Sequence, residues 1–409
     1  MLNGNKIKKN NFISQKNRVH AIDGLRGFSL FGILIANLLI FQYGLFGKDY
    51  IEIFELNLLD QSVYAFTKIA FEASFMPIFT FLFGYSFMIM RDNLAKNELR
   101  IKWHLFRRSV ILIGFGMLHA TYLWEGDILF VYGLMGICLL VFVNRHPKTI
   151  LIWTCLLFGL IGTINLPFFE EGDLFDSHTV ETYINETTDV YENGSYAAIQ
   201  DYRNNADDPV TDFLSKSNAG IAAIFMMPLL IAPMFLLGMY AAKEEWLQRP
   251  KETERTYKIG ASICLLLGVL LKTYGYFSKI EGLFHIGGMV LSLGYICLSG
   301  VLYANIRHSV LLRSFESVGK LSLTNYIVQS IICTTIFYGY GLGLFSKLGM
   351  INAFLLGIVI FCIQTLMSHY YVKTFRYGPL EKLLRIGTYL SVNGKTKRQK
   401  QYIKDSKTS

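Results

Sequence analysis

Long apolar segments recur along the whole chain, and most approach the ~20 residues that an α-helix needs to cross a bilayer. Ten segments have this character: about 22–44, 62–90, 109–124, 128–143, 149–167, 219–242, 257–276, 284–304, 321–342 and 349–372. Hydrophobic residues make up 52% of the 409 positions and charged residues 17%, whereas about a quarter of a soluble domain is charged. The pattern predicts an all-α fold, a polytopic transmembrane helical bundle of about ten spans.

Lysine and arginine are concentrated on one side of the predicted membrane. With the N-terminus inside, the inside segments carry 31 of the 39 basic residues and nine of the 30 acids. Because basic loops stay in the cytoplasm, both termini are predicted to be cytoplasmic. The tails would be residues 1–20 and 391–409, the second one disordered, around a bundle of residues 21–390. The net charge of +9 follows from this topology and from anionic membrane lipid, so no nucleic-acid partner is expected.

The predicted external segment 168–218 is strongly acidic. It carries 12 acids against two basic residues, Arg203 and Lys216. Two interpretations are open: a solvated connector, or a cap over a site on the outer face. The connector is slightly favoured, because acidic composition alone is common on an external surface.

The second span is too long for one straight crossing. The stretch from Leu58 to Glu72 is therefore expected to lie partly along the membrane interface before the helix enters. Lys68 and Glu72 are four residues apart, so they are expected to form an ion pair on one helix face.

Polar residues inside apolar spans are costly and mark candidate functional sites. Asp23 and Arg26 lie three residues apart at the inner mouth of the first span, where they either pair with each other or hold an anionic ligand. Asn37 lies about 21 Å further along this helix at 1.5 Å per residue. Its amide either joins neighbouring helices or serves the site.

The stretch "GMLHATYLWEGDIL" places an imidazole inside the third span and two carboxylates at its outer end. His119 lies about 16 Å beyond Arg108, near the membrane midplane. Asp127 opens the next helix and suits its N-cap. Asp127 or Glu125 near the imidazole would also fix its tautomer, as general-base chemistry requires.

A polar cluster begins the ninth span in "GKLSLTNYIVQS". Thr324 and Ser330 are compatible with helix capping alone. Asn325 and Gln329, four residues apart, are interpreted as lining a cavity and binding substrate. The six cysteines lie inside apolar segments with no CxxC or zinc spacing, so neither a disulfide framework nor a metal site is expected.

Several motifs carry a resemblance over residues 18–390. The segments "IDGLRGFSLFGILIANL", "LFGYSF", "GMLHATYLWEGDILFVYGLMG", "VGKLSLTNYIVQS" and "FRYGPLEKLLR" resemble the YeiB-like bacterial membrane proteins. These are more distantly similar to the transmembrane acyltransferases that include lysosomal heparan-alpha-glucosaminide N-acetyltransferase. The shared D-x-x-R-G element and following Asn match Asp23, Arg26, Gly27 and Asn37. In the lysosomal enzyme a functional histidine follows that Asn by eleven residues, where this chain has Lys48.

The resemblance implies acyl transfer across a bacterial plasma membrane, from cytosolic acyl-CoA to an envelope acceptor, a glycan or a lipid. His119 would then be the general base or a transient acyl carrier, oriented by Asp127 or Glu125. Asn37 would stabilise the oxyanion, and Asp23 and Arg26 would shape the donor site. A proton-coupled or lipid transporter is the alternative, and a non-catalytic envelope scaffold is third. Membrane lipid is an expected partner, and homodimer formation is left open.

Overall fold

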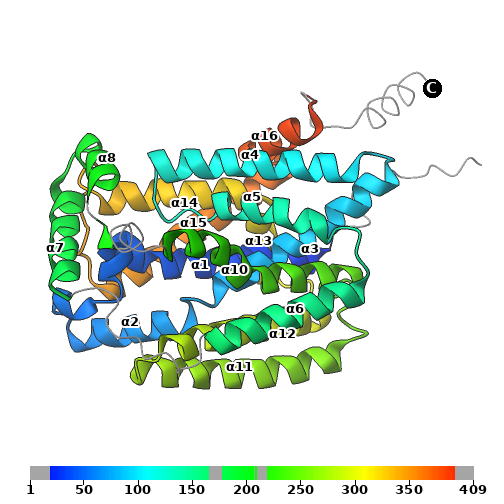
Figure 1. Cartoon of the computed structure of the whole chain (residues 1–409), viewed down its shortest axis with the longest axis horizontal. Helices are drawn as coiled ribbons and strands as arrows, with labels where there is room; N and C mark the ends of the chain where they lie inside the picture. Colours follow the sequence, from blue (N-terminus) through cyan, green and yellow to red (C-terminus); the bar gives the residue numbers. More distant parts are fainter. Residues whose placement is uncertain (1–18, 165–176, 207, 210–218, 392–409) are drawn as a thin grey trace, which may run out of the picture.

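The computed structural model describes residues 19–164, 177–206, 208–209 and 219–391, and every regular element within them is a helix (Figure 1). The elements are α1 (His20–Gly47), η1 (Ile51–Phe54), α2 (Leu58–Ala70), α3 (Phe75–Lys96), α4 (Ile101–Tyr122), α5 (Leu129–Cys138), η2 (Leu139–Val141), α6 (Pro147–Ile164), α7 (Ser177–Asn193), α8 (Tyr196–Asn205), α10 (Ala219–Lys243), α11 (Glu254–Phe277), α12 (Glu281–Asn305), α13 (Val310–Lys320), α14 (Ser322–Phe337), α15 (Met350–Thr374) and α16 (Pro379–Tyr389). The predicted all-α fold is confirmed. The two terminal tails lie almost entirely outside the described residues.

The predicted spans coincide with helices. Five helical stretches of the described chain are long and apolar enough to cross a membrane: His20–Gly47, Leu58–Lys96, Glu254–Phe277, Glu281–Asn305 and Met350–Thr374. Shorter apolar helices cover the predicted fourth, fifth, sixth and ninth spans. The chain is therefore a polytopic helical bundle, and the number and direction of its crossings stay predictions.

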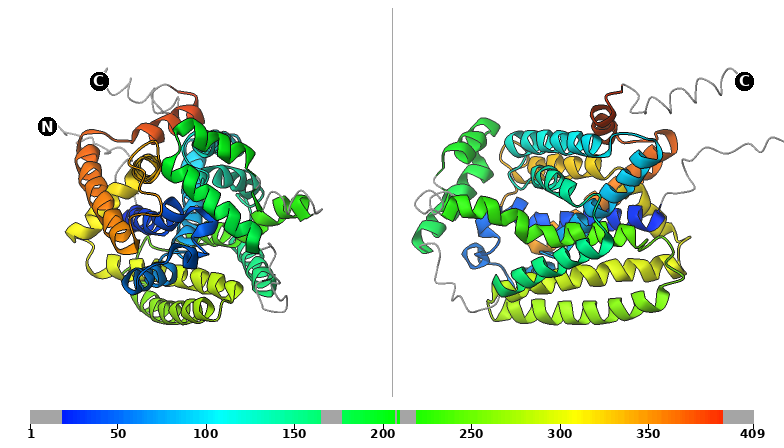
Figure 2. Two further views of the ribbon diagram at one scale, coloured as in Figure 1. Left: turned by 90° about the vertical axis from the view of Figure 1, so that its left-hand side faces the viewer. Right: turned by 45° about the vertical axis from the view of Figure 1, so that its right-hand side comes forward.

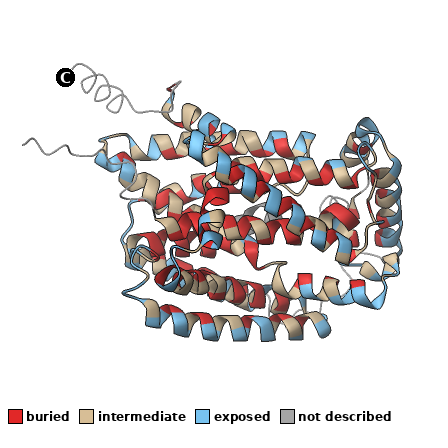
Figure 3. Ribbon diagram, turned by 180° about the vertical axis from the view of Figure 1, so that it is seen from behind, coloured by how far each residue is buried: buried red, intermediate tan, exposed pale blue. Residues whose placement is uncertain are grey.

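The outward faces of the bundle are apolar, as contact with lipid requires. On α11, Ile263, Leu266 and Leu270 are 58%, 64% and 57% exposed, although they are hydrophobic. Figure 3 shows the opposite distribution inside, where buried residues are concentrated on the central helices. An apolar face with no protein partner is expected where acyl chains replace water.

Helix α1 lies in the middle of the bundle, and the other helices surround it (Figure 2). Glycines allow its close contact with α13. A methyl group added at Gly27 would overlap the carbonyl oxygen of Phe315, and one at Gly319 would overlap that of Asp23. Small residues at such crossings let helix backbones touch. The glycines of "DGLRG" therefore have a packing role.

The long second segment is broken at residues 71–74 into α2 and α3. Lys272 of α11 is fully buried at this break, and its Nζ donates hydrogen bonds to the carbonyl oxygens of Lys68 (2.8 Å) and Glu72 and to Ser74 Oγ (3.0 Å). A cation at a helix C-terminus satisfies carbonyls that lack intrahelical partners. The predicted pair of Lys68 and Glu72 is present at 2.7 Å.

The acidic segment that is predicted to be external contains two packed helices, α7 and α8, which lie across one end of the bundle (Figure 1). Val180, Ile184 and Tyr191 share one face of α7 and are buried. The backbone carbonyl of Tyr191 also accepts a hydrogen bond from the Gly339 amide at 2.7 Å. The favoured solvated connector is wrong for residues 177–206, because an apolar stripe at helical spacing lies within the acidic composition. Residues 168–176, 207 and 210–218 lie outside the described part.

Candidate functional site

His119 forms hydrogen bonds through both ring nitrogens. Its Nδ1 lies 2.8 Å from Asp127 Oδ1, and its Nε2 lies 2.9 Å from the hydroxyl oxygen of Ser330 on α14. His119 and Ser330 are each 2% exposed. Two helices and the turn after α4 thus bring an acid, an imidazole and a hydroxyl into one buried chain of hydrogen bonds.

The turn between α4 and α5 positions Asp127. The amides of Leu123 and Trp124 both donate to the His119 carbonyl at 2.9 Å, which closes the end of α4. The second carboxylate oxygen of Asp127 accepts a hydrogen bond from the Phe130 amide at 2.7 Å, in the first turn of α5. One oxygen therefore caps the helix and the other holds the imidazole, so the arrangement satisfies both interpretations of Asp127.

The positions of the protons in the Asp127–His119–Ser330 hydrogen bonds follow from which groups can donate and which can accept. An ionised carboxylate only accepts, so the Nδ1–H of His119 donates to Asp127. In the neutral ring Nε2 then carries a lone pair, and the Ser330 hydroxyl donates to it. This order of acid, imidazole and hydroxyl is the one that activates a serine nucleophile in hydrolases.

Aromatic rings enclose the imidazole. The Tyr326 ring centroid lies 5.2 Å from that of His119, and the Trp124 centroid lies 6.3 Å away. Trp124 stacks on Phe41 of α1 with centroids 4.2 Å apart. The Tyr326 hydroxyl accepts from the Ile128 amide, and all three aromatic residues are buried. The hydrogen bonds of His119 therefore lie in an environment of low polarity, where they are stronger than in water.

Glu125 does not contact His119; its carboxylate contacts α7 and α8, the helices over the end of the bundle. Its carboxylate lies 3.2 Å from Arg203 Nε of α8 and accepts a hydrogen bond from the Tyr191 hydroxyl at 3.0 Å. Burial, followed by the Glu125 charge, raises the pKa of Tyr191 well above its ordinary value, so the phenol stays a donor. Of the two carboxylates proposed to orient His119, only Asp127 contacts it.

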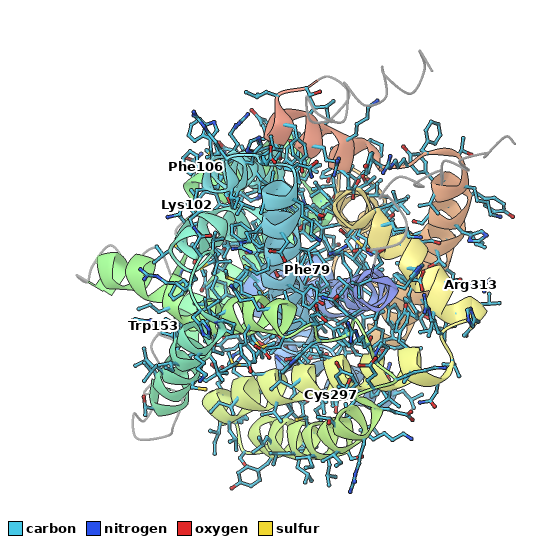
Figure 4. The ribbon with its side chains drawn as sticks, turned by 90° about the vertical axis from the view of Figure 1, so that its right-hand side faces the viewer. Phe79, Lys102, Phe106, Trp153, Cys297 and Arg313 are labelled. Atoms are coloured by element: carbon cyan, nitrogen blue, oxygen red, sulfur yellow. The ribbon has the colours of Figure 1, made fainter. Side chains whose placement is uncertain are left out.

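A cavity of about 190 Å³ lies beside the Tyr326 ring, between α1, α3, α4, α5, α13, α14 and α16. Four charged residues line it: Arg26, Arg108, Lys320 and Glu381. Its remaining wall is mostly apolar and aromatic and includes Phe79 of α3, which lies near the middle of the bundle (Figure 4). Three cations against one carboxylate make this cavity suited to an anionic ligand.

Glu381, the carboxylate that lines the cavity, accepts hydrogen bonds from the N-terminus of a helix. Glu381 of α16 accepts hydrogen bonds from the amides of Leu323 (2.8 Å) and Thr324 (3.1 Å), and from the Thr324 hydroxyl (2.6 Å). It therefore caps α14 and neutralises the positive end of that helix. Arg108 and Lys320 were not identified from the sequence, because basic residues at span ends ordinarily face the cytoplasm.

Arg26 lines the cavity and also forms hydrogen bonds within the protein. It donates to Asp23 at 3.3 Å and to Ser86 Oγ at 2.6 Å. The local pair expected for Asp23 and Arg26 is thus present, and Arg26 also lines the cavity while Asp23 does not. Asp23 is buried against α13.

Asn325 and Gln329, which were expected to line a cavity and bind substrate, do not line the cavity beside Tyr326. Both are buried, at 7% and 3% exposed, and neither contributes to the cavity wall. The Asn325 amide donates to Ser368 at 3.0 Å, and the Gln329 amide donates to Gln364 at 2.9 Å. Both amides find their partners on α15 and join α14 to it, so they hold helices together.

Asn37 shares a face of α1 with Leu34 and Phe41, both of which belong to the core around Trp124. It is partly exposed, and its side chain has no hydrogen-bond partner among the described residues. No hydrogen bond joins it to His119, whose ring nitrogens bind Asp127 and Ser330, so its oxyanion role stays a prediction.

Lys48 occupies the position at which the lysosomal acyltransferase has a histidine. Its Nζ lies 2.5 Å from Asp49 and 2.8 Å from Glu72. Burial lowers the pKa of Lys48, but the Glu72 and Asp49 carboxylates outweigh it, so the net pKa lies above the ordinary value. Lys48 therefore stays protonated at neutral pH and does not replace the missing imidazole as a base.

The fold and the site define a polytopic helical membrane protein with a buried acid–imidazole–hydroxyl chain beside a basic cavity. A family model described as "Protein of unknown function (DUF418)" matches residues 241–391. The uncharacterized protein YxaH of Bacillus subtilis is 32% identical over 392 residues, covering 91% of this chain and 95% of the relative. The uncharacterized protein YeiB of Escherichia coli is 24% identical over 384 residues, covering 89% and 94%. The chain belongs to this YeiB-like family, as the sequence motifs indicated.

Proposed function

We propose that the protein is a transmembrane acyltransferase, which moves an acyl group from cytosolic acyl-CoA to an acceptor on the outer side of the bacterial plasma membrane. The observation that carries this proposal is the hydrogen-bonded chain of Asp127, His119 and Ser330 beside a cavity with three cations. The three hydrogen-bonded residues would supply a base, and the basic cavity would attract a phosphorylated donor.

The basic cavity supports the donor site. Guanidinium groups recognise phosphate through paired N–H donors, and both Arg26 and Arg108 line the cavity. The cavity, about 190 Å³, is smaller than the roughly 300–1,000 Å³ of a typical small-molecule site. It is therefore too small for the whole donor, so the phosphate groups would bind at Arg26 and Arg108 while the adenosine stays at the cytosolic mouth.

His119 would take a proton during acyl transfer, and Asp127 would stabilise the imidazolium that forms. Asn37 remains the proposed donor to the developing oxyanion, because its amide is partly exposed within the bundle and has no partner among the described residues. Preorganised donors of this kind contribute about 2.7–4 kcal/mol of transition-state stabilisation.

The alternative is a proton-coupled or lipid transporter. A buried His119–Asp127 pair inside a membrane protein is also the arrangement of a proton relay. The basic cavity favours acyl transfer over a proton-coupled transporter, because a proton relay requires no anion site.

Donor binding separates the two functions. Purified protein in nanodiscs is titrated with CoA and acetyl-CoA while its melting temperature is recorded. A ligand of the folded state raises that temperature by mass action, and Arg26→Ala should reduce the shift. Lys258→Ala is the matched control, since this exposed lysine pairs only with Glu254 in the described chain. No shift at millimolar CoA would contradict the acyltransferase and favour the transporter.

A further inference from the structure

Ser330 differs in its hydrogen bonding from Ser29, Ser109 and Ser292, three other buried serines of the bundle. Serine in a membrane helix ordinarily donates to a carbonyl of the preceding turn. Ser29, Ser109 and Ser292 do so at 2.7, 3.0 and 2.6 Å. The corresponding distance from Ser330 to the Tyr326 carbonyl is 3.5 Å, at the limit for a hydrogen bond, whereas His119 Nε2 lies at 2.9 Å. The hydroxyl proton of Ser330 is therefore directed at the imidazole.

His119 has no ring nitrogen left for any other group. Asp127 occupies Nδ1, and Ser330 occupies Nε2. An external acceptor would have to displace Ser330 before His119 could deprotonate it. The hydroxyl that the imidazole is placed to activate is the one that it already binds.

We propose that Ser330 is the nucleophile of the reaction and carries the acyl group as a covalent ester. The inference rests on the proposed acyltransferase function and adds a two-step mechanism to it. A nucleophile with a base in hydrogen-bond reach, and a third group that orients the base, is the arrangement of covalent catalysis.

In the first step Ser330 Oγ attacks the thioester carbonyl carbon, and its proton passes to His119 Nε2. The C–S bond then breaks, and the CoA thiolate leaves with the proton from Nε2 as free thiol. In the second step an acceptor hydroxyl or amine attacks the ester carbonyl and gives its proton to Nε2. The C–O bond to Ser330 breaks, and Nε2 returns the proton to Oγ. Asp127 stays ionised throughout.

The position of Ser330 fits a carrier between two sides of the bundle. Leu323 and Tyr326 of α14 line the basic cavity, and Ser330 is one turn further along the same helix face. Tyr326 lines the cavity and its ring centroid lies 5.2 Å from that of His119, whereas His119 and Ser330 do not line the cavity. In the proposed mechanism the Tyr326 ring therefore moves aside for the thioester to reach Oγ. Beyond His119 lies the end of α4 under α7 and α8, the side proposed for the acceptor.

Isotope exchange tests this mechanism without knowledge of the acceptor. The full-length protein in nanodiscs is incubated with acetyl-CoA and radiolabelled CoA, and label in acetyl-CoA is measured. A covalent carrier releases CoA before the acceptor binds, so the wild type should exchange label. Peptide mass spectrometry after acid quench should locate a hydroxylamine-sensitive acetyl ester on Ser330.

Variants make the assignment specific. Ser330→Ala and His119→Ala should lose at least a hundredfold in exchange rate and show no ester, while their melting temperatures still rise with CoA. Ser292→Ala is the matched control, a fully buried serine bonded only within α12 in the described chain, and it should exchange like the wild type. If Ser330→Ala fails to fold, Ser330→Cys should still exchange label and carry the acetyl group as a thioester.

Three results would overturn the carrier. One is exchange that persists in Ser330→Ala, and another is an ester mapped to a different residue. The third is CoA binding by the wild type with neither exchange nor ester; the proposed donor site would then stand with direct transfer. Absence of CoA binding would remove the proposed function as well.

Discussion

Arg203 of α8 lies 3.2 Å from Glu125, in the turn that also carries Asp127. The same guanidinium donates to the carbonyl of Ala120 at 2.5 Å, one residue after His119. The helices over the end of the bundle are thus attached to the segment that forms the site. A disturbance of α8 should reach the turn and the geometry of the imidazole.

Arg203→Ala should loosen this attachment. It removes a largely buried ion pair and leaves the Glu125 carboxylate with only the Tyr191 hydroxyl. Loss of such a partner costs about 1–3 kcal/mol, so the melting temperature should fall by several degrees. Limited proteolysis within residues 177–206 should also accelerate.

Arg249→Ala, which removes exposed pairs with Glu245 and Glu252, is the control and should change stability by no more than about 0.5 kcal/mol. Equal stability of the two variants would contradict the attachment.

Gly27→Ala should disrupt the contact between α1 and α13. The added methyl group would overlap the backbone oxygen of Phe315, which cannot rotate away as a side chain would. Overpacking of this kind costs about 1–3 kcal/mol or more, and we expect a lower melting temperature and poor yield of monodisperse protein. Gly159→Ala in α6 is the control, because its methyl group would meet open space and alanine favours helix by about 1 kcal/mol. A Gly27→Ala protein as stable as the control would contradict the crossing.

Local patterns predicted the helices well and their contacts less well. The apolar segments indicated ten helical regions, and the four-residue spacing predicted the ion pair of Lys68 and Glu72. Both features depend on neighbours along the chain. By contrast, 211 residues separate His119 from Ser330, and their contact depends on which helices pack together. The residues next to Lys272 and Ser330 in the sequence likewise do not indicate which distant groups these two side chains contact.

The acidic composition of residues 168–218 also led to a wrong expectation for the helices within them that the structure describes. The stretch around Val180, Ile184 and Tyr191 has helical spacing, but its acidic neighbours favoured the interpretation of a solvated connector. Asn325 and Gln329 were expected to line a cavity because they lie four residues apart. Those partners are supplied by α15, at Ser368 and Gln364, and single-sequence analysis has no means of placing α15 beside α14.

The predicted topology is tested by labelling with an impermeant thiol reagent in intact cells. In a background lacking the native cysteines, Ser195→Cys at the exposed start of α8 should react, because the acidic segment is predicted to be external. Ser406→Cys, in the basic C-terminal tail, should react only after the cells are lysed. The reverse pattern would overturn the orientation and with it the direction of acyl transfer.

Asp127→Asn tests the proton arrangement while keeping the fold. The Phe130 amide still needs an acceptor, so the asparagine oxygen should face it and the NH₂ group should face His119 Nδ1. The NH₂ group only donates, so Nδ1 becomes the acceptor and the ring proton moves to Nε2. Nε2 then donates to Ser330 and takes no proton from it. Exchange of CoA into acetyl-CoA should fall by about 10⁴-fold, as when a triad aspartate becomes asparagine, with little change in melting temperature.

Glu125→Gln is the companion variant for this measurement. Glutamine at residue 125 loses the ion pair with Arg203 but leaves the hydrogen bonds of His119 intact, so exchange should fall by less than about tenfold. A large loss in Asp127→Asn with a small loss in Glu125→Gln would identify Asp127 as the carboxylate that sets the tautomer. Equal losses in both variants would mean that the turn acts through its structure alone. In that case the imidazole would hold the two helices together, and the base would have to be sought elsewhere along the cavity.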